Sequence, residues 1–373
     1  MKTIIEDKYI IFLVFSGVVG LFTNIPKEYG TYVGTGGWVI IIIDLLLILP
    51  PSFAIVWLNK QYEGRIIPEY LVEILGKYIS LPINVLYFMR YFMLVPLMTR
   101  ALLGMVKSTS LETTPIWPLA FIFLACACYA AAQGIKSLSY ICQFFILTAL
   151  ILSSILFFAL LSKGGFINLR PFFVKEDIPL YFKESIRNLR IFFGAGVLLV
   201  VPFSKKDNKK TGKYLLIGYM IITLFYLFVF WGTVSVSGIN QTVLFDDIFF
   251  IAVRSVEIQN LEILKRLDGL AIAAFTFTSL MMVAVDIYGA AVILKYYLEK
   301  TKMPKKMTLS FSCIVISIIG FVLCVIIPST FALRKYLLIS YKIAWLTSMI
   351  LPMVLFIIVK IKRRINKETS QQN

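Results

Sequence analysis

The sequence contains no histidine, and only 15% of its 373 residues are charged. The lack of histidine excludes a histidine general base, a histidine-liganded zinc site and a histidine-ligated haem. A cysteine nucleophile would lack the histidine that normally activates it. We find no GxSxG, HExxH or P-loop motif. The sequence therefore predicts a protein that is not an enzyme, with no catalytic residue, no metal and no cofactor.

Cysteines are also few, and all five lie inside apolar runs. Cys126 and Cys128 are two positions apart, so on a helix they point to different sides. We interpret the cysteines as small buried hydrophobic side chains rather than a disulfide framework or a metal site. They are Cys126, Cys128, Cys142, Cys313 and Cys324.

Apolar residues are abundant, at 59% of the chain, against about 45–50% in soluble domains. They form runs of roughly 20 residues, long enough to cross a hydrocarbon core of about 30 Å as helices. The runs are continuous rather than alternating, which excludes a membrane β-barrel. We therefore expect an all-α membrane protein with a single transmembrane domain over 1–373 and about ten spanning helices. The expected spans are 9–33, 37–58, 81–106, 115–132, 138–161, 187–204, 212–237, 268–294, 308–328 and 336–360.

The formal net charge is +17, which on a soluble protein would suggest nucleic acid. Here the basic residues lie in short connections between apolar runs, so they indicate topology and attraction to anionic lipid, and no nucleic-acid partner is expected. With the N-terminus inside, the inner segments carry 21 basic residues and the outer segments 13, nine of them in the long connections 162–190 and 239–267. Long connections weigh less in orientation. Both termini are predicted to be cytoplasmic, and 241–266 is predicted to form short amphipathic helices at the interface.

The first and sixth spans share a glycine–proline pattern. Gly20 precedes Pro26, and Gly196 precedes Pro202, by the same six residues. Glycine weakens a helix and proline removes a backbone donor, so both spans are expected to be broken. Four spans lie between them, and successive spans alternate in direction, so the first and sixth spans cross in opposite senses. Such a pair points to a five-plus-five inverted repeat with a midplane site, although glycine and proline also serve close packing of membrane helices. The repeats would cover about 9–161 and 187–360.

Several stretches carry a family resemblance: GVVGLFTNIP, EYLVEILGKYISLPINVLYFMRY, TPIWPLAFIFLACACYAAAQGIKSLSYICQ, FFGAGVLLVVPFSKK and LKRLDGLAIAAFTFT. In order and spacing they resemble the GerAB-like spore germination permeases, the B subunits of germinant receptors within the amino acid–polyamine–organocation superfamily. The resemblance implies a site between spans one, three, six and eight. It also implies a complex with an A-type membrane subunit and a C-type lipoprotein in the spore inner membrane. Many members carry a glutamate where this chain has Gly196, which argues against a carboxylate role there.

Ionisable residues inside spans are costly and commonly functional or paired. We interpret Arg100 as an outer-face side chain that reaches the interface, and we assign Asp44 no partner. Asp286 with Arg90 or Lys342 is a plausible buried pair, either as a tie between helices or as part of an ion path. These five complete the set of intramembrane charges.

The broken segments are the candidate ligand site, because their free backbone groups can bind a carboxylate, an ammonium group or an ion. Each aromatic or hydroxyl side chain in the set also has an ordinary role in helix packing. The candidate residues are Ser16, Gly17, Gly20, Tyr91, Phe193, Gly194, Gly196, Thr278 and Ser279.

Three functions fit these features. The first is a nutrient-sensing subunit of a spore germination receptor that binds a small solute, in particular an amino acid. The second is an H⁺- or Na⁺-coupled secondary amino acid transporter. The third is a structural membrane partner without its own ligand, which the paired broken helices disfavour.

Overall fold

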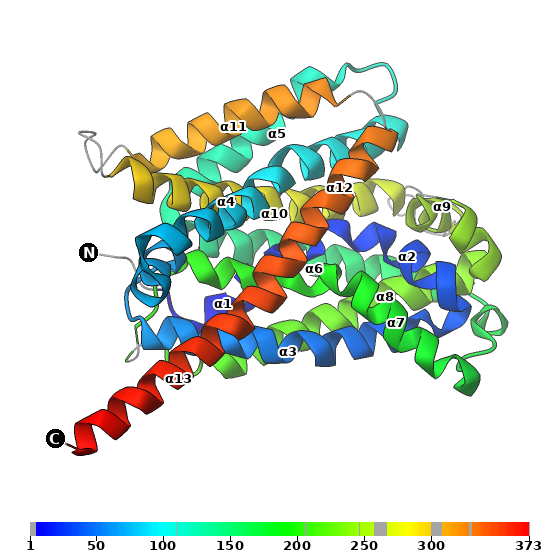
Figure 1. Cartoon of the computed structure of the whole chain (residues 1–373). Helices are drawn as coiled ribbons and strands as arrows, with labels where there is room; N and C mark the ends of the chain where they lie inside the picture. The colour runs from blue at the N-terminus through cyan, green and yellow to red at the C-terminus, as the bar shows by residue number, and fades with distance from the viewer. Residues whose placement is uncertain are drawn as a thin grey trace.

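The computed structural model describes residues 5–109, 111–204, 206, 208–245, 247–256, 267–299, 308–327 and 330–372. This part of the chain consists of helices and short connections, with no strand among its residues (Figure 1). The α-helices are α1 Ile10–Ser16, α2 Ile25–Val33, α3 Gly37–Gln61, α4 Ile67–Thr109, α5 Ile116–Ala132, α6 Gly134–Lys163, α7 Ile178–Asn188, α8 Thr211–Leu244, α9 Ile248–Arg254, α10 Leu267–Leu298, α11 Thr308–Ile326, α12 Thr330–Trp345 and α13 Leu351–Gln372.

Short helices of other types connect some of these elements. The 3₁₀ segment η2 (Val19–Asn24) joins α1 to α2, and η6 (Leu189–Val200) continues α7. A π-helical turn, Leu346–Ile350, joins α12 to α13. The remaining 3₁₀ turns are Asp7–Tyr9, Gly34–Gly36, Phe166–Leu169 and Lys175–Asp177.

Seven helical stretches of the described residues are long and apolar enough to cross a membrane. The expectation of an all-helical membrane protein is confirmed, whereas the count of ten spans stays a prediction. The shorter helix α5 is apolar as well, and the two interrupted spans are built from short pieces. The seven stretches are Phe22–Gln61, Ile67–Thr109, Gly134–Lys163, Thr211–Leu244, Leu267–Leu298, Thr308–Ile326 and Ala332–Ile365.

Helix α10 occupies the centre of the bundle. Two thirds (67%) of its most apolar stretch is buried inside the protein, the highest share among the seven. It packs against α4, α6, α11 and α5. α12 and α13 together cross the bundle obliquely, in contact with α4 and α3 (Figure 1). A charged residue in the middle part of α10, such as Asp286, is therefore held deep in the molecule.

Both termini lie at the same end of the bundle (Figure 1). We call this end the termini face. It also carries the α3–α4 connection and the residues after η6, which are bonded together from the Gly64 amide to the Phe203 carbonyl at 2.7 Å. The other end, with the α2–α3 connection and α9, is called the opposite face.

Two boundaries differ from the sequence prediction for a physical reason. The helical part of span six begins at Ile178 rather than 187, because α7 is polar and offers no apolar run. Span three continues a helix that starts at Ile67, with a kink at Gly76, whose φ of 80° suits glycine. The predicted helices of 241–266 are α9 and the end of α8, and 257–266 lies outside the described residues.

Candidate functional site

The first span is interrupted as the glycine–proline pattern predicts. Helix α1 ends at Ser16, and Val18 leaves helical geometry with φ −130° and ψ −43°. After η2, helix α2 restarts with Pro26 in its first turn, where a missing N–H costs nothing. The break takes backbone groups of this segment out of the helical pattern, and side chains bind two of its carbonyls. Tyr226 donates to Val18 at 3.3 Å and Ser279 to Gly20 at 3.4 Å.

The sixth span is interrupted in the same region. After α7, the chain continues as the tighter 3₁₀ segment η6, which Phe193 breaks with ψ 29°. Val201 is extended at the end of the segment. A long 3₁₀ stretch is unusual and often marks a functional or strained position. All residues of η6 except Arg190 are buried.

The two interrupted spans meet at a pair of glycines, which we call the crossing. A Cβ added to Gly17 would lie 3.2 Å from the Cα and the carbonyl oxygen of Gly194. A Cβ on Gly194 would overlap the carbonyl oxygen of Val14 and would lie 2.5 Å from a methyl group of Val18. A side chain at Gly194 would therefore overlap the first span, and one at Gly17 would crowd the backbone of Gly194. A ligand bound here would need the two spans to move apart.

Side chains from neighbouring helices bind the backbone of η6. The Tyr219 hydroxyl donates to the Phe192 carbonyl at 3.1 Å and accepts from the Ala195 amide at 3.1 Å. Tyr91 donates to the carbonyl of Gly196 at 2.6 Å. Further donors are Tyr226 to Ile191, Asn59 to Leu198 and Arg90 to Phe193. These bonds replace those that a regular helix would make.

Arg90 links three elements beside the crossing. Its Nη2 donates to the Phe193 carbonyl at 3.0 Å, and its Nε to Ser348 Oγ at 3.0 Å. Ser348 belongs to the π-helical turn, a type of turn common at functional sites. A Cβ at Gly196 would overlap the guanidinium group, so a side chain there would have to displace Arg90. Arg90 therefore fills the space beside Gly196.

Asp286, on the central helix, is 5% exposed. Its Oδ2 has no hydrogen-bond partner among the described residues. Arg90 interacts with it electrostatically, but no oxygen of Asp286 lies within 4.0 Å of an Arg90 nitrogen in this part of the chain. Lys342 has an exposed side chain. The structure thus brings Arg90 to the region of Asp286 but does not place Lys342 there.

The other predicted site residues are buried near the crossing with local bonds. Ser16 Oγ donates to the Leu13 carbonyl at 2.9 Å. Thr278 bonds back within its own helix, and Ser279 Oγ donates to the Gly20 carbonyl at 3.4 Å. A Cβ on Gly20 would lie 2.5 Å from the sulfur of Met282. Spans one and eight are therefore in direct contact.

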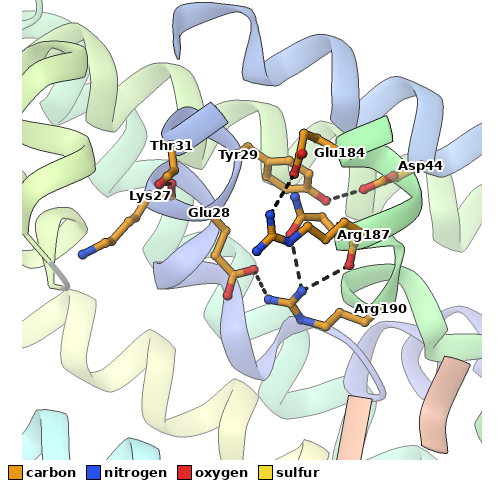
Figure 2. A network of polar contacts seen from close by, with 9 residues as sticks. Lys27, Glu28, Tyr29, Thr31, Asp44, Glu184, Arg187 and Arg190 are labelled. Atoms are coloured by element: carbon orange, nitrogen blue, oxygen red, sulfur yellow. Dashed lines mark hydrogen bonds and ion pairs between the residues drawn. The ribbon is translucent and has the colours of Figure 1, made fainter. Parts of the chain in front are cut away.

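A polar cluster joins α2, α3 and α7 to the start of η6, and Figure 2 shows it from close by. Asp44 is fully buried and accepts a hydrogen bond from Tyr29 at 2.5 Å and another from Ser185. Glu28 and Arg190 form an ion pair at 2.7 Å. The cluster supplies Asp44, left unassigned from sequence, with partners from α2 and α7.

Further contacts extend this cluster around the span ends. Arg190 lies 4.4 Å from the ring centroid of Tyr341, on α12, and Arg187 lies 4.5 Å from that of Tyr32. Arg187 also pairs with the buried Glu184 at 3.6 Å (Figure 2). Charged and aromatic groups thus join α2 and α7, the pieces of the two interrupted spans nearer the opposite face, to α3 and α12.

An open cleft of about 380 Å³ lies at the termini face, away from the crossing. Tyr62, which lines it, stacks on the buried Tyr70 with ring centroids 5.3 Å apart. Lys362 of the wall donates to the carbonyl of Ile74 at 2.6 Å. The cleft is lined by Gln61, Tyr62, Glu63, Arg65, Glu73, Ile74, Val359, Lys362 and Arg363.

The sequence prediction named Tyr91 but missed the rest of a polar stripe on α4. Ser80, Asn84, Tyr87 and Tyr91 follow one another at spacings of four, three and four residues, and each is at most 1% exposed. This spacing places them on one face of a helix. The signal was present in the sequence, but aromatic residues in an apolar span were read as packing. Glu28 and Arg190 were missed because their pairing joins residues 162 positions apart.

None of the five cysteines forms a disulfide bond. Cys142, Cys313 and Cys324 are buried, whereas Cys126 is exposed and Cys128 half-buried. The prediction that all five are buried is thus wrong for Cys126, because α5 lies at the edge of the bundle and turns that side of the helix outward. Among the described residues, no group of three or more acidic or cysteine side chains is arranged to hold a metal.

Comparison with known proteins places these features in a family. The sequence profile of the spore germination protein family matches residues 5–330. The chain belongs to this family. The match includes both interrupted spans and the polar stripe, and it confirms the resemblance found in the sequence.

Relatives in Bacillus subtilis match a smaller part of the chain than the family profile does. Spore germination protein A2 is 27% identical over 212 residues, which are 57% of this chain and 58% of that protein. The putative spore germination protein YfkT is 26% identical over 263 residues, 70% of each chain. The chain thus matches little more than half the length of spore germination protein A2.

Solved structures show the fold. A Na⁺-coupled sialic acid symporter, described in a substrate-bound outward-open state, has a TM-score of 0.68 at 16% identity, covering 92% of this chain and 76% of its own. MhsT, solved in complex with L-phenylalanine, has a TM-score of 0.67 at 10% identity, covering 96% and 89%. The chain therefore has the inverted-repeat fold of these transporters, which confirms the predicted fold class.

Proposed function

We propose that this protein is a nutrient-sensing membrane subunit of a spore germination receptor, which binds a small solute at the crossing. One observation carries the proposal: in a member of the spore germination protein family, two interrupted spans meet glycine to glycine at Gly17 and Gly194. Such breaks form the ligand site of inverted-repeat transporters. A receptor can use the same site to convert binding into a conformational change.

The ligand would bind between the broken segments after they separate. The free amides of one segment suit a carboxylate, and the carbonyls of η6 suit an ammonium group. Tyr91 and Arg90 bind those carbonyls in this conformation, so ligand binding would exchange their bonds. An amino acid has both groups, and MhsT, which shares the fold, was solved with L-phenylalanine.

Location and partners follow from the family. The protein would lie in the spore inner membrane with both termini in the cytoplasm, supported by basic residues such as Lys60, Lys362 and Arg363 at the termini face. It would assemble with an A-type membrane subunit and a C-type lipoprotein. Pull-down of both from spore membranes by a tagged form of this chain tests the assembly.

The second candidate is an H⁺- or Na⁺-coupled amino acid transporter, and the fold it shares with a Na⁺-coupled symporter favours it. Purified chain in liposomes distinguishes the two functions. Uptake of labelled amino acid that requires an ion gradient and this chain alone would support transport. Nutrient binding without uptake would support the receptor.

A nutrient panel tests binding directly. Purified protein should gain thermal stability with at least one amino acid, because a ligand that binds only the folded state stabilises it. Gly194→Leu should abolish this shift and the germination response while the protein remains in the membrane. Gly104→Leu is the matched control, since a Cβ there meets nothing within 4 Å. Gly20→Ala adds a milder test against the movable Met282 side chain.

Two results would contradict the proposal. One is a normal nutrient response in Gly194→Leu, which would remove the crossing from the binding site. The other is unchanged germination to every nutrient after deletion of the gene, which would remove the receptor function.

A further inference from the structure

Buried polar groups without protein partners are concentrated between the cleft at the termini face and the crossing. Twelve buried side-chain atoms in the described residues have no hydrogen-bond partner, and four of them lie on α4 and α10 in this region. They are Tyr70 Oη, Asn84 Oδ1, Tyr87 Oη and Asp286 Oδ2. Three of the other eight, on Glu28, Glu184 and Arg190, belong to ion pairs.

These groups follow one another in order from the cleft inward along α4 and α10. Tyr62 lines the cleft and stacks on Tyr70. Beyond the kink at Gly76, Tyr87 and Tyr91 lie one turn apart on the buried face of α4. The ring of Tyr91 packs against Gly289 of α10, about one turn from Asp286. We call this series, from Tyr62 to Asp286, the tyrosine column.

The column runs along the contact between α4 and α10. Asn84 donates to the Tyr297 hydroxyl at 3.1 Å, which ties the two helices near the termini face. Farther in, Gly289 makes room for the ring of Tyr91, since a Cβ there would lie 2.6 Å from it. Tyr70, Asn84, Tyr87 and Tyr91 are each 0% exposed. The column is therefore enclosed by protein along its length.

Enclosed hydroxyl and carboxylate groups without protein partners are costly unless water binds them. Several such groups in series can hold a chain of water molecules, each bonded to two or more of them. Arg90 lies beside the inner end and is positively charged, which disfavours a metal cation next to Asp286. A proton is the cation that this site can accept, because it becomes part of the carboxyl group.

We propose that the tyrosine column holds bound water that connects the cleft to Asp286 and delivers protons to this carboxylate. A proton enters as hydronium from the aqueous side, passes along the water chain and ends on a carboxylate oxygen, which gives the neutral acid and leaves water behind. The charged and titratable groups that act on Asp286 are Arg90 and Tyr91 of α4. Thiols on adjacent helices are Cys142 of α6 and Cys313 of α11. The proposal goes beyond nutrient sensing and holds whether or not the crossing binds a nutrient.

Radiolytic hydroxyl-radical labelling of the full chain in lipid nanodiscs tests the bound water. Radicals formed from bound water modify the side chains beside it even where bulk solvent does not reach. Tyr70 and Tyr87 should be modified several-fold faster than Tyr219 and Tyr226, which are equally buried but bond to protein groups. Equal, slow modification of all four would overturn the proposal.

Infrared difference spectroscopy tests proton delivery. The carboxyl band of Asp286 is identified by its loss in Asp286→Asn. After a step in pH or a change to deuterated water, its response should be several-fold slower in Tyr70→Phe/Tyr87→Phe. Tyr181→Phe is the matched control, because Tyr181 is buried at the opposite face. An unchanged response in the double variant would overturn the proton path, even if labelling detects water.

Discussion

Buried polar groups on the two sides of the crossing differ in whether they have partners within the protein. Toward the opposite face, charges are paired within the protein: Glu28 with Arg190, and Asp44 with the hydroxyls of Tyr29 and Ser185. Toward the termini face, the hydroxyls of Tyr70 and Tyr87 have no partner among the residues that the structure describes. Direct pairs hold elements together, whereas unpaired hydroxyls require water. Direct pairs thus hold the side of the opposite face together, although Asn188 Nδ2 and Trp231 Nε1 there also lack partners among the described residues. The other side is the one for which we propose bound water.

The comparison has a structural consequence for the interrupted spans. The paired cluster joins α2 and α7 to α3 and α12, so these outer pieces have to break several contacts before they can separate. The tyrosine column has fewer bonds of this kind between its members. We therefore expect substitutions of Asp44, in the cluster, and of Arg90, between the cluster and the column, to lower stability more than substitutions within the column.

Arg90 stands where the two sides meet, and its loss should have the largest effect. Arg90→Ala removes the bonds to Phe193 and Ser348 and leaves Asp286 without its nearby cation. Removing one partner of buried charges costs about 3–5 kcal/mol. Thermal unfolding in detergent should show a large loss, whereas Arg100→Ala, on the same helix and half-buried, should show little. Equal losses would show that Arg90 does not hold the interruption.

Asp44 tests the paired cluster. Asp44→Ala leaves the hydroxyls of Tyr29 and Ser185 without an acceptor in a fully buried place. Each such loss costs about 1–3 kcal/mol. We expect a clear drop in the unfolding temperature, with partial recovery when Tyr29→Phe is added, since this removes one unpaired hydroxyl. A neutral Asp44→Ala would contradict a structural role for the cluster.

Tyr91 and Tyr87 give a direct contrast between a satisfied and an unsatisfied hydroxyl on the same helix face. Tyr91→Phe loses the bond to the Gly196 carbonyl, which should cost about 1 kcal/mol. Tyr87→Phe loses no bond to protein and should be close to neutral. Denaturation of the two variants side by side measures the difference. A larger loss in Tyr87→Phe would mean that its hydroxyl has a protein partner.

The Glu28–Arg190 pair should have only a small effect on stability. Its side chains are 28% and 15% exposed, and partly solvated pairs contribute about 0.2–1 kcal/mol. Glu28→Gln should therefore lower the unfolding temperature only slightly. Its effect should be clearer on opening, measured as faster labelling of a cysteine introduced by Ser16→Cys. If the labelling rate is the same with and without Glu28, the ion pair does not help to keep the opposite face closed.

Much of the architecture followed from the sequence. Apolar runs of bilayer length predict spanning helices, because the bilayer core forces backbone groups to pair within each segment. The paired Gly20–Pro26 and Gly196–Pro202 patterns predict two broken spans, because glycine and proline weaken a helix wherever they occur. The polar helix α7 was missed, since it lacks the apolar pattern on which span prediction depends.

The sequence by itself determined a helical membrane protein with two interrupted spans, since length, hydropathy and backbone chemistry are local properties. The tertiary structure alone decided how the polar groups pair. Asp44 meets Ser185 across 141 positions, and Arg90 meets Ser348 across 258. It also decided that Asp286 lies near Arg90 but away from the exposed Lys342. Such contacts depend on the packing of helices distant in sequence, which periodicity within one helix does not encode.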